Sequence, residues 1–300
     1  KIDDGEVNYT VVSSKSISSD PNYNDLTVAD VELTNIDDDS TGFDLSAISD
    51  SITTEAGGSA TFTVSLLSQP IVGVVVSITS SDTTEGVLVP ESIVFTDKNW
   101  NTVHTATVTG FDDDIDDGDI DYTIKISSSS NDPTYSVLND TSISFTNSDD
   151  DLAGLTISGK SGLVTTEAGG DTSITVMLNS EPISDVLIVL TSSDSSEGLP
   201  DSDSLRFTPS TWDTKQDLKV VGQHDYLDDG DVAYNITGVL RSIDEKYNSL
   251  DLFILSATNT DNDSAAVNVT LLTQPITNED NLSALLTIGL NSEPTSDVTI

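Results

Sequence analysis

The chain has 300 residues and carries 52 acidic against 10 basic side chains, a net charge of −42. This balance excludes nucleic acid as a natural partner, because too few cations are present to replace the counterions of phosphate. It also disfavours an anionic membrane surface. Hydrophobic residues make up 35% of the chain and recur in short patterned runs, so we expect a folded core despite a charge typical of disordered chains.

The sequence contains no cysteine, so neither a disulfide framework nor thiol chemistry is available to it. No apolar run approaches the roughly 20 residues of a membrane-spanning helix, so we expect no direct membrane insertion, and no signal peptide is visible. The chain opens with KIDDGEVNYT, a stretch typical of the middle of a domain. We therefore expect a window on a longer protein.

The sequence repeats itself with a period of 112 residues, as positions 53 and 165 show. The motif TTEAGG begins at Thr53 and again at Thr165, and DDGD begins at Asp116 and again at Asp228. Partial copies of the repeat occupy both ends. We predict four segments: the end of a preceding repeat at residues 1–39, full repeats at 40–151 and 152–263, and the start of a following repeat at 264–300.

Within each full repeat, short runs alternate between apolar and polar residues, as half-buried strands do. In the first full repeat the predicted strands are residues 60–66, 74–79, 92–96, 105–110, 120–126 and 141–146. In the second they are residues 173–178, 186–191, 204–208, 218–222, 232–237 and 252–258. About seven short strands in roughly 110 residues predict an antiparallel sandwich. The expected fold class is all-β, with immunoglobulin-like sandwiches in tandem, like beads on a string.

An acidic triplet follows the last predicted strand of each repeat. It occurs in TNIDDDSTG at residues 34–42, in TNSDDDLAG at 146–154 and in TNTDNDSAA at 258–266. Two carboxylates about 5 Å apart repel by roughly 1 kcal/mol in water and by about 3 kcal/mol at the effective dielectric of a protein surface. Acids gathered in this way would splay apart without a cation, or the cation is part of the fold.

Three features occur in the same order in each repeat: a Glu-x-Gly turn before a strand, an Asp-rich loop after the fifth strand, and the acidic triplet. Together they resemble the Calx-beta domain, an immunoglobulin-like sandwich of sodium/calcium exchangers, integrin β4 and large bacterial surface proteins. The series TTEAGG, SSDTTEG, NW, VTG and DDG is most similar to the tandem bacterial form, and it covers nearly the whole chain. The resemblance implies that acidic residues at one end of each sandwich bind a small Ca²⁺ cluster.

Carried over by position, the resemblance implies ligands in the first full repeat at Glu55, Asp82, Asp112, Asp113, Asp116, Asp117, Asp149, Asp150 and Asp151. In the second repeat it implies Glu167, Asp194, Asp225, Asp228, Asp229, Asp261 and Asp263. The first triplet, Asp37, Asp38 and Asp39, is expected to hold an ion in the same way. The second repeat departs from the pattern, because His224, Tyr226 and Asn262 replace Asp112, Asp114 and Asp150. Its site is expected to be weaker or to hold fewer ions.

The donor chemistry also favours Ca²⁺ as the cofactor. Ca²⁺ takes six to eight oxygen ligands, whereas Mg²⁺ prefers few carboxylates and several waters. The chain offers no cysteine and no pair of histidines for zinc or copper. The alternative is a solvated acidic surface of the kind found in proteins from salty habitats.

The remaining residues suggest structural positions rather than catalysis. Trp100 and Trp212 are expected to close one end of each core, and His104 and His224 to lie at surface positions. No nucleophile elbow, phosphate-binding loop or HExxH motif is present, so we expect no enzymatic activity. Counting carboxylates leaves a glycosidase pair open, although aromatic residues for a sugar-binding cleft are only 5% of the chain.

The leading hypothesis is an extracellular or cell-surface structural array (a stalk, an adhesin extender or a filament) that Ca²⁺ at the repeat ends makes rigid. Its partners are then the neighbouring repeats of the same chain. One alternative is an adhesive module that contacts a receptor, a glycan or neighbouring copies. Another is a self-assembling surface fibre that does not need calcium. A calcium-sensing regulatory domain is the third.

Overall fold

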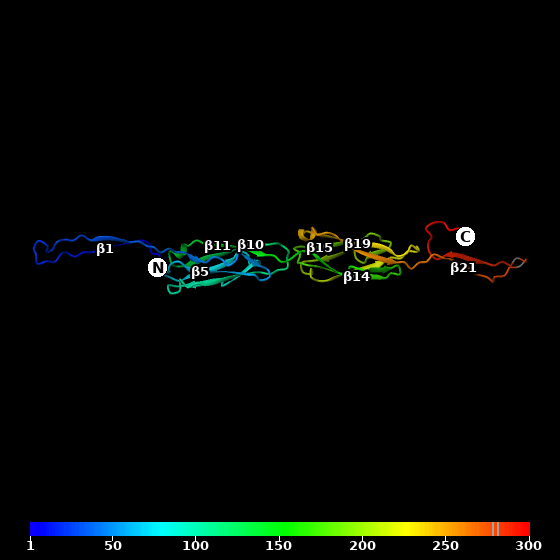
Figure 1. Ribbon diagram of the computed structural model, residues 1–300, viewed down its shortest axis with the longest axis horizontal. Coiled ribbons are helices and arrows are strands. Elements are labelled where there is room, and N and C mark those ends of the chain that lie inside the picture. Colours follow the sequence, from blue (N-terminus) through cyan, green and yellow to red (C-terminus); the bar gives the residue numbers. More distant parts are fainter. Residues whose placement is uncertain (278, 281) are drawn as a thin grey trace. The chain divides into compact units, whose positions relative to one another are not determined.

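The computed structural model describes residues 1–277, 279–280 and 282–300, and nearly all of its elements are β-strands (Figure 1). By their internal contacts these residues form two compact units. The first comprises residues 1–113 and 117–150, and the second residues 114–116 and 151–300. The predicted all-β class is confirmed, while the boundaries of the four predicted segments stay a prediction.

The first unit contains a sandwich of two sheets, and its core lies between them. The four-stranded sheet has the order β3 (Phe43–Leu45), β5 (Ser59–Leu66), β9 (His104–Gly110) and β7 (Gly86–Val89). The five-stranded sheet has the order β4 (Ile52–Thr54), β11 (Thr141–Ser148), β10 (Ile120–Ser130), β6 (Val74–Ser80) and β8 (Ser92–Phe95). A 3-10 turn, η1 (Tyr135–Val137), separates β10 from β11.

The second unit contains a sandwich with the same strand order. Its four-stranded sheet runs β12 (Leu155–Ser158), β14 (Asp171–Leu178), β18 (Gln216–Gly222) and β16 (Gly198–Pro200). Its five-stranded sheet runs β13 (Leu163–Thr166), β20 (Phe253–Thr260), β19 (Val232–Ser242), β15 (Val186–Ser192) and β17 (Ser204–Phe207). A one-turn helix, α1 (Glu245–Asn248), stands where η1 stands in the first unit.

The six strands predicted for each full repeat are all present, but each sandwich has nine strands among the described residues rather than about seven. The additional strands are β3, β4 and β7 and their counterparts β12, β13 and β16, which have only three or four residues. Such short segments contain too few residues for an alternating pattern to be recognised. They form because longer neighbouring strands offer them hydrogen bonds.

The alternating residues predicted to face inward do form the two cores. Phe62, Ile124 and Phe95 are essentially inaccessible in the first unit, and Phe207 has the place of Phe95 in the second. Trp100 and Trp212 pack, partly buried, against their respective cores, as expected.

In each sandwich, a hydrogen-bonded network of buried polar side chains connects three neighbouring strands of the five-stranded sheet. In the first unit, the Tyr122 hydroxyl lies 3.0 Å from Thr53 Oγ1, which donates over 3.0 Å to Asn147 Oδ1. Tyr234, Thr165 and Asn259 repeat the arrangement in the second unit, with both distances 2.9 Å. Buried polar groups are tolerated when their hydrogen bonds are satisfied in this way. The network fixes β4 against its neighbour β11, and β13 against its neighbour β20.

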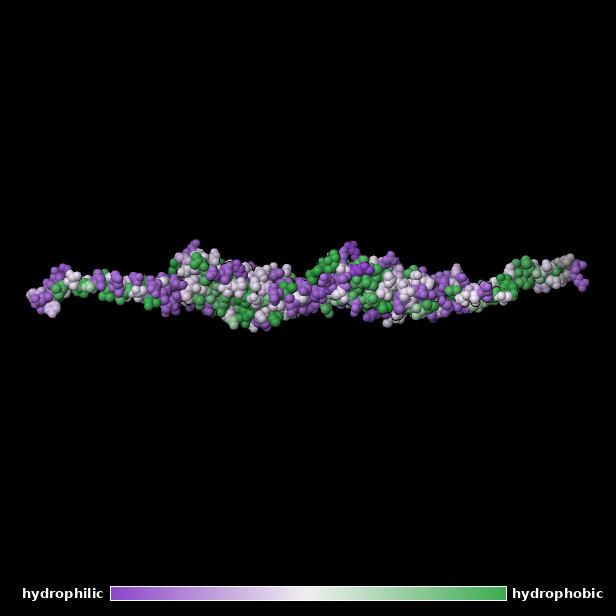
Figure 2. Space-filling view, turned by 90° about the horizontal axis from the view of Figure 1, so that it is seen from above, coloured by the Kyte–Doolittle hydropathy of each residue, from purple (hydrophilic) through white to green (hydrophobic). Residues whose placement is uncertain are grey.

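Two-stranded hairpins lie outside the two sandwiches. β1 (Val7–Val11) pairs with β2 (Val31–Asn35), and β21 (Val267–Leu271) pairs with β22 (Leu286–Leu290). Every residue of these four strands is exposed, and Figure 2 shows hydrophobic residues on the surface of the β21–β22 hairpin. A search of the described residues for a helix long and apolar enough to cross a membrane finds none.

The close packing of Gly86 against Tyr122 leads to a stability prediction. A Cβ at Gly86 would lie 2.3 Å from Tyr122 Cε2, whereas a Cβ at Gly73 would meet only the Phe95 carbonyl, at 3.5 Å. We expect Gly86→Ala to lower the free energy of unfolding by about 1–3 kcal/mol through overpacking. Gly73→Ala, the control, should change it by no more than about 0.5 kcal/mol. Urea unfolding measures both, and equal effects would contradict the packing argument.

Candidate metal centres

A glutamate is buried at the same end of each sandwich, beyond the polar network. Glu85 is 6% exposed and Glu197 is 5% exposed. The network reaches them through its asparagine, since Asn147 Nδ2 donates to Glu85 Oε2 over 3.4 Å and Asn259 Nδ2 to Glu197 Oε2 over 3.3 Å. The core of each sandwich therefore positions a carboxylate at its end.

These buried glutamates lie among other carboxylates. In the second unit, Glu197, Asp225 and Asp229 each offer an oxygen within 4.8 Å of the others. Burial raises the pKa of Glu197 above its usual value; the bond from Asn259 opposes this shift, and the charge of Asp229 adds to it. Such a site is unfavourable for negative charge unless a cation neutralises it.

In the first unit, Glu85 also lies near other negatively charged side chains. Burial raises the pKa of Glu85, the bond from Asn147 opposes this shift, and the negative charges of Asp117, Asp113 and Asp82 add to it. Asp117 and Asp113 occupy the positions of Asp229 and Asp225 in the repeat. The long loop after β9 and the turn after β6 thus bring acids to one buried carboxylate.

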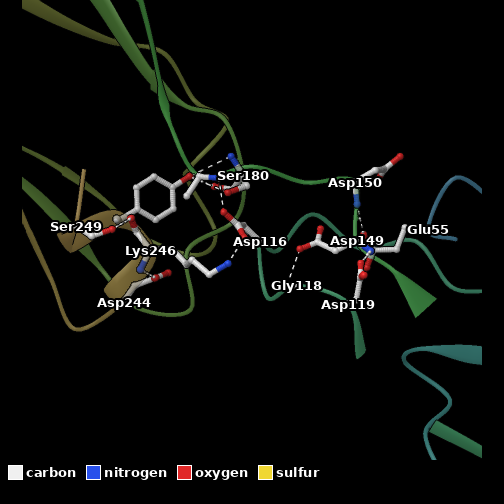
Figure 3. Close-up of polar contacts among 12 residues, drawn as sticks. Glu55, Asp116, Gly118, Asp119, Asp149, Asp150, Ser180, Asp244, Lys246 and Ser249 are labelled. Atoms are coloured by element: carbon white, nitrogen blue, oxygen red, sulfur yellow. Dashed lines mark hydrogen bonds and ion pairs between the residues drawn. The ribbon is translucent and has the colours of Figure 1, made fainter. Parts of the chain in front are cut away.

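A second cluster contains the early glutamate and the acidic triplet. Glu55 is 3% exposed and, with Asp150 and Asp151, offers oxygens within 4.8 Å of one another. Its Oε2 also accepts a hydrogen bond of 3.2 Å from the Asp150 amide (Figure 3). Residues about 95 positions apart in sequence meet here because β4 lies parallel to β11.

The matching cluster of the second unit contains a histidine. Glu167, which is 3% exposed, offers a ligand atom within 4.8 Å of those of His224 and Asp263. Burial raises the pKa of Glu167, the bond from the Asn262 amide opposes this shift, and the charge of Asp261 adds to it. The Oδ2 atom of Asp263 is buried without a hydrogen-bond partner among the described residues. This oxygen accepts no hydrogen bond from these residues, and a bound cation would satisfy it instead.

Other predicted ligands hold turns in this structure. The first acid of each triplet accepts from the glycine amide of the DDG motif: Asp37 from Gly5 at 2.7 Å, Asp149 from Gly118 at 2.6 Å and Asp261 from Gly230 at 2.8 Å. Asp82 accepts from the Thr84 amide and hydroxyl, and Asp194 from those of Ser196. The pKa of Asp82 is lowered, first by the hydroxyl of Thr84 and then by its amide.

The first aspartate of the DDG motif accepts a bond from the chain that follows the triplet. Asp3 Oδ2 accepts from the Thr41 amide at 2.7 Å, Asp116 Oδ2 from that of Ala153 at 2.8 Å, and Asp228 Oδ2 from that of Ala265 at 2.6 Å. These three bonds repeat along the chain and hold each acidic loop against the segment after the triplet.

Asp116 differs from the other two aspartates because it also has a cationic partner. The other oxygen of Asp116 contacts the ammonium group of Lys246 (Figure 3). Burial alone would raise the pKa of Asp116, but the Ala153 amide and Lys246 lower it below its usual value. Lys246 therefore neutralises one carboxylate that was predicted to bind metal.

The structure thus divides the predicted ligands into groups, and their metal role stays a prediction. Those within or beside the clusters are Glu55, Asp113, Asp117, Asp150, Asp151, Glu167, Asp225, Asp229, Asp263 and the triplet Asp37, Asp38 and Asp39. Those bonded to turns or to the following segment are Asp82, Asp116, Asp149, Asp194, Asp228 and Asp261. Asp112 is exposed and joins none of the clusters found among the described residues.

Three residues within or beside the clusters were not predicted as ligands: Glu85, Glu197 and His224. The glutamates recur with the repeat period, which was a usable signal, but a Glu-Gly pair in a turn does not reveal that its side chain is buried. His224 was expected at the surface, where it is, but its proximity to Glu167 depends on the tertiary fold.

The donor set fits a divalent cation. All candidate atoms except those of His224 are carboxylate oxygens, the ligands that Ca²⁺ prefers. In the described part of the chain, no lysine or arginine pairs with Glu85, Glu167 or Glu197. Leaving such charges buried and uncompensated is costly, so the residues present are compatible with a bound ion.

The raised pKa values predict how stability depends on pH without metal. Because Glu85, Glu167 and Glu197 bind protons more tightly in the folded chain, folding takes up protons above their ordinary value of 4.5. In chelator, the melting temperature should therefore rise as the pH falls from 7 to about 5. Thermal unfolding followed by circular dichroism measures this melting temperature. The double variant Glu85→Gln with Glu197→Gln should show a smaller increase between pH 7 and about 5. A melting temperature that falls over this range would contradict the prediction.

The stability gained on acidification should reverse at lower pH. The pKa of Asp82 and that of Asp261 lie below the ordinary value of 3.8, each because of hydrogen bonds that its charged form accepts. The stability from such groups is present above their unfolded pKa and is lost as the pH falls through the folded one. The same melts, extended below pH 3.8, should show this decline.

The sequence matches no protein-family model and no curated protein. Among solved structures, it is similar to a protein of unknown function from Porphyromonas gingivalis W83, with 9% identity over 72% of this chain and 99% of that one and a TM-score of 0.28. It is also similar to CBD12 from CALX1.2, with 15% identity over 64% and 77% of the two chains and a TM-score of 0.29. Domains 4 and 5 of the S-layer protein SbsC match with 10% identity over 62% and 77% and a TM-score of 0.30.

Proposed function

We propose that this chain is part of an extracellular structural array whose sandwich repeats are stabilised by Ca²⁺. The observation that carries the proposal is the gathering of acids from separate loops around a buried glutamate, at the same end of both sandwiches. A surface adapted only to salt would spread its acids over solvent rather than bury Glu55 and Glu197 among other carboxylates.

The role proposed is structural and not catalytic. The buried glutamates are held by the polar network of the core, so the ion would act on the stability of the whole sandwich. Binding of an ion to the folded state alone stabilises it in proportion to the logarithm of the ion concentration. A medium with abundant Ca²⁺, such as the cell exterior, would supply that ion.

The array is proposed to become stiffer with Ca²⁺, because Asp150 and Asp151 form a cluster with Glu55 in the short stretch between β11 and β12. An ion held there would restrain the backbone that leads from one sandwich into the next. The neighbouring repeats of the same chain are then the natural partners, and a receptor or further copies are not required.

Thermal unfolding tests the calcium proposal. At a Ca²⁺ concentration about 100 times the dissociation constant, one bound ion should add about 2.7 kcal/mol to the free energy of unfolding. We expect melting in Ca²⁺ well above that in Mg²⁺ or in chelator, by several degrees. Glu55→Gln should remove part of the shift, whereas Asp97→Asn, which removes one exposed charge outside the clusters, should preserve it. Equal melting in all three conditions would reject calcium stabilisation.

Scattering tests the stiffening separately. Ca²⁺ should narrow the distribution of dimensions that small-angle X-ray scattering reports for the wild-type chain, because the restrained stretch samples fewer conformations. The double variant Asp150→Asn with Asp151→Asn should keep the broad distribution in Ca²⁺. If it narrows like the wild type, the triplet has no such role.

A further inference from the structure

The metal clusters of the two repeats differ in their donor atoms. The cluster of Glu55, Asp150 and Asp151 offers only carboxylate oxygens, whereas that of Glu167, His224 and Asp263 offers two carboxylates and one imidazole. The difference arises because His224 replaces Asp112 and Asn262 replaces Asp150 in the repeat. The second cluster therefore has less negative charge and one nitrogen ligand.

The unpaired oxygen of Asp263 points to a ligand at this cluster. Its Oδ2 atom is buried and has no donor among the described residues, although the imidazole of His224 is close by. Three potential ligand atoms thus lie within 4.8 Å of one another, and one of them has no hydrogen-bond donor among the described residues.

The surroundings leave His224 available for such a centre. Its ring packs edge-on against Tyr226, with the ring centroids 4.7 Å apart, which restricts its orientation. A hollow of about 450 Å³, lined in part by Glu167, His224 and Asn262, opens beside the cluster. Water molecules could complete a coordination shell there, as metal sites with three protein ligands require.

We propose that Glu167, His224 and Asp263 bind a divalent transition-metal ion of the zinc class in preference to Ca²⁺. Ca²⁺ is bound by oxygen ligands, and a site with fewer carboxylates binds it more weakly. Imidazole is a suitable ligand for zinc, copper, iron and nickel. At sites with both nitrogen and oxygen ligands, first-row transition metals therefore bind more tightly than Ca²⁺. The inference rests on the proposed function only in placing a divalent cation at the end of a sandwich.

The test titrates the full chain, freed of metal, with ZnCl₂ and separately with CaCl₂ by calorimetry. His224→Asp, which restores the residue of the first repeat, should weaken Zn²⁺ binding at least about tenfold, since the loss of even an outer-shell partner costs that much. The same variant should bind Ca²⁺ at the second repeat more tightly. The control is His104→Gln, because Gln216 has that position in the second repeat and the fold accepts it. It should leave Zn²⁺ binding unchanged.

A second measurement does not depend on any variant. The chain has two histidines, so proton NMR resolves one Hε1 ring signal for each, and Zn²⁺ should shift that of His224 but not that of His104. Zn²⁺ binding that is equal in the wild type and in His224→Asp, or a His224 signal that does not respond, would overturn the inference.

The outcome also separates this inference from the proposed function. Zn²⁺ binding at His224 together with no Ca²⁺ stabilisation would reject the calcium array and keep the transition-metal site. Ca²⁺ stabilisation that depends on Glu55, without a response of His224 to Zn²⁺, would keep the calcium array and reject the transition-metal site.

Discussion

The hydrogen bond from one asparagine amide to a buried glutamate connects the core of each sandwich to its acidic end. Asn147 accepts from Thr53 with its oxygen and donates to Glu85 and to the Phe111 carbonyl with its nitrogen. Both N–H groups of the amide and one lone pair of its oxygen are therefore satisfied inside the protein, which restricts the position of the side chain. Displacing it would expose the core network and release the glutamate together.

This connection explains why the acids are gathered rather than dispersed. Loops with a high negative charge would normally extend into solvent, where water screens their repulsion. Here the glutamate is fixed by the core, and the loops around it are fixed by glycine amides that bond to Asp149 and Asp261. The backbone thus imposes the proximity of the carboxylates, and a cation would relieve the resulting repulsion without moving the chain.

The repeat period and the alternation of residues were sufficient to predict the class of fold and the longer strands. The resemblance to Calx-beta domains also implied Glu55, Asp150 and Asp151 as ligands, and the structure brings oxygens of these three residues within 4.8 Å of one another. Sequence could not separate a carboxylate that faces a cluster from one that holds a turn, because Asp149 and Asp150 are adjacent and chemically identical. Their roles differ through main-chain amides whose directions depend on the folded backbone. The burial of Glu85 and the approach of His224 to Glu167 likewise depend on contacts between distant segments.

The bond between Lys246 and Asp116 has a consequence for how the chain responds to its medium. In the second unit the cation beside the acidic loop is encoded in the sequence, whereas the equivalent position beside Asp3 in the first unit is occupied by Thr134. The ammonium group of a lysine is part of the chain, so neither a chelator nor a lower ion concentration in the medium removes it. A protein made of many such repeats could therefore combine stretches that loosen when divalent ions are scarce with stretches that do not, and a single codon would decide which is which.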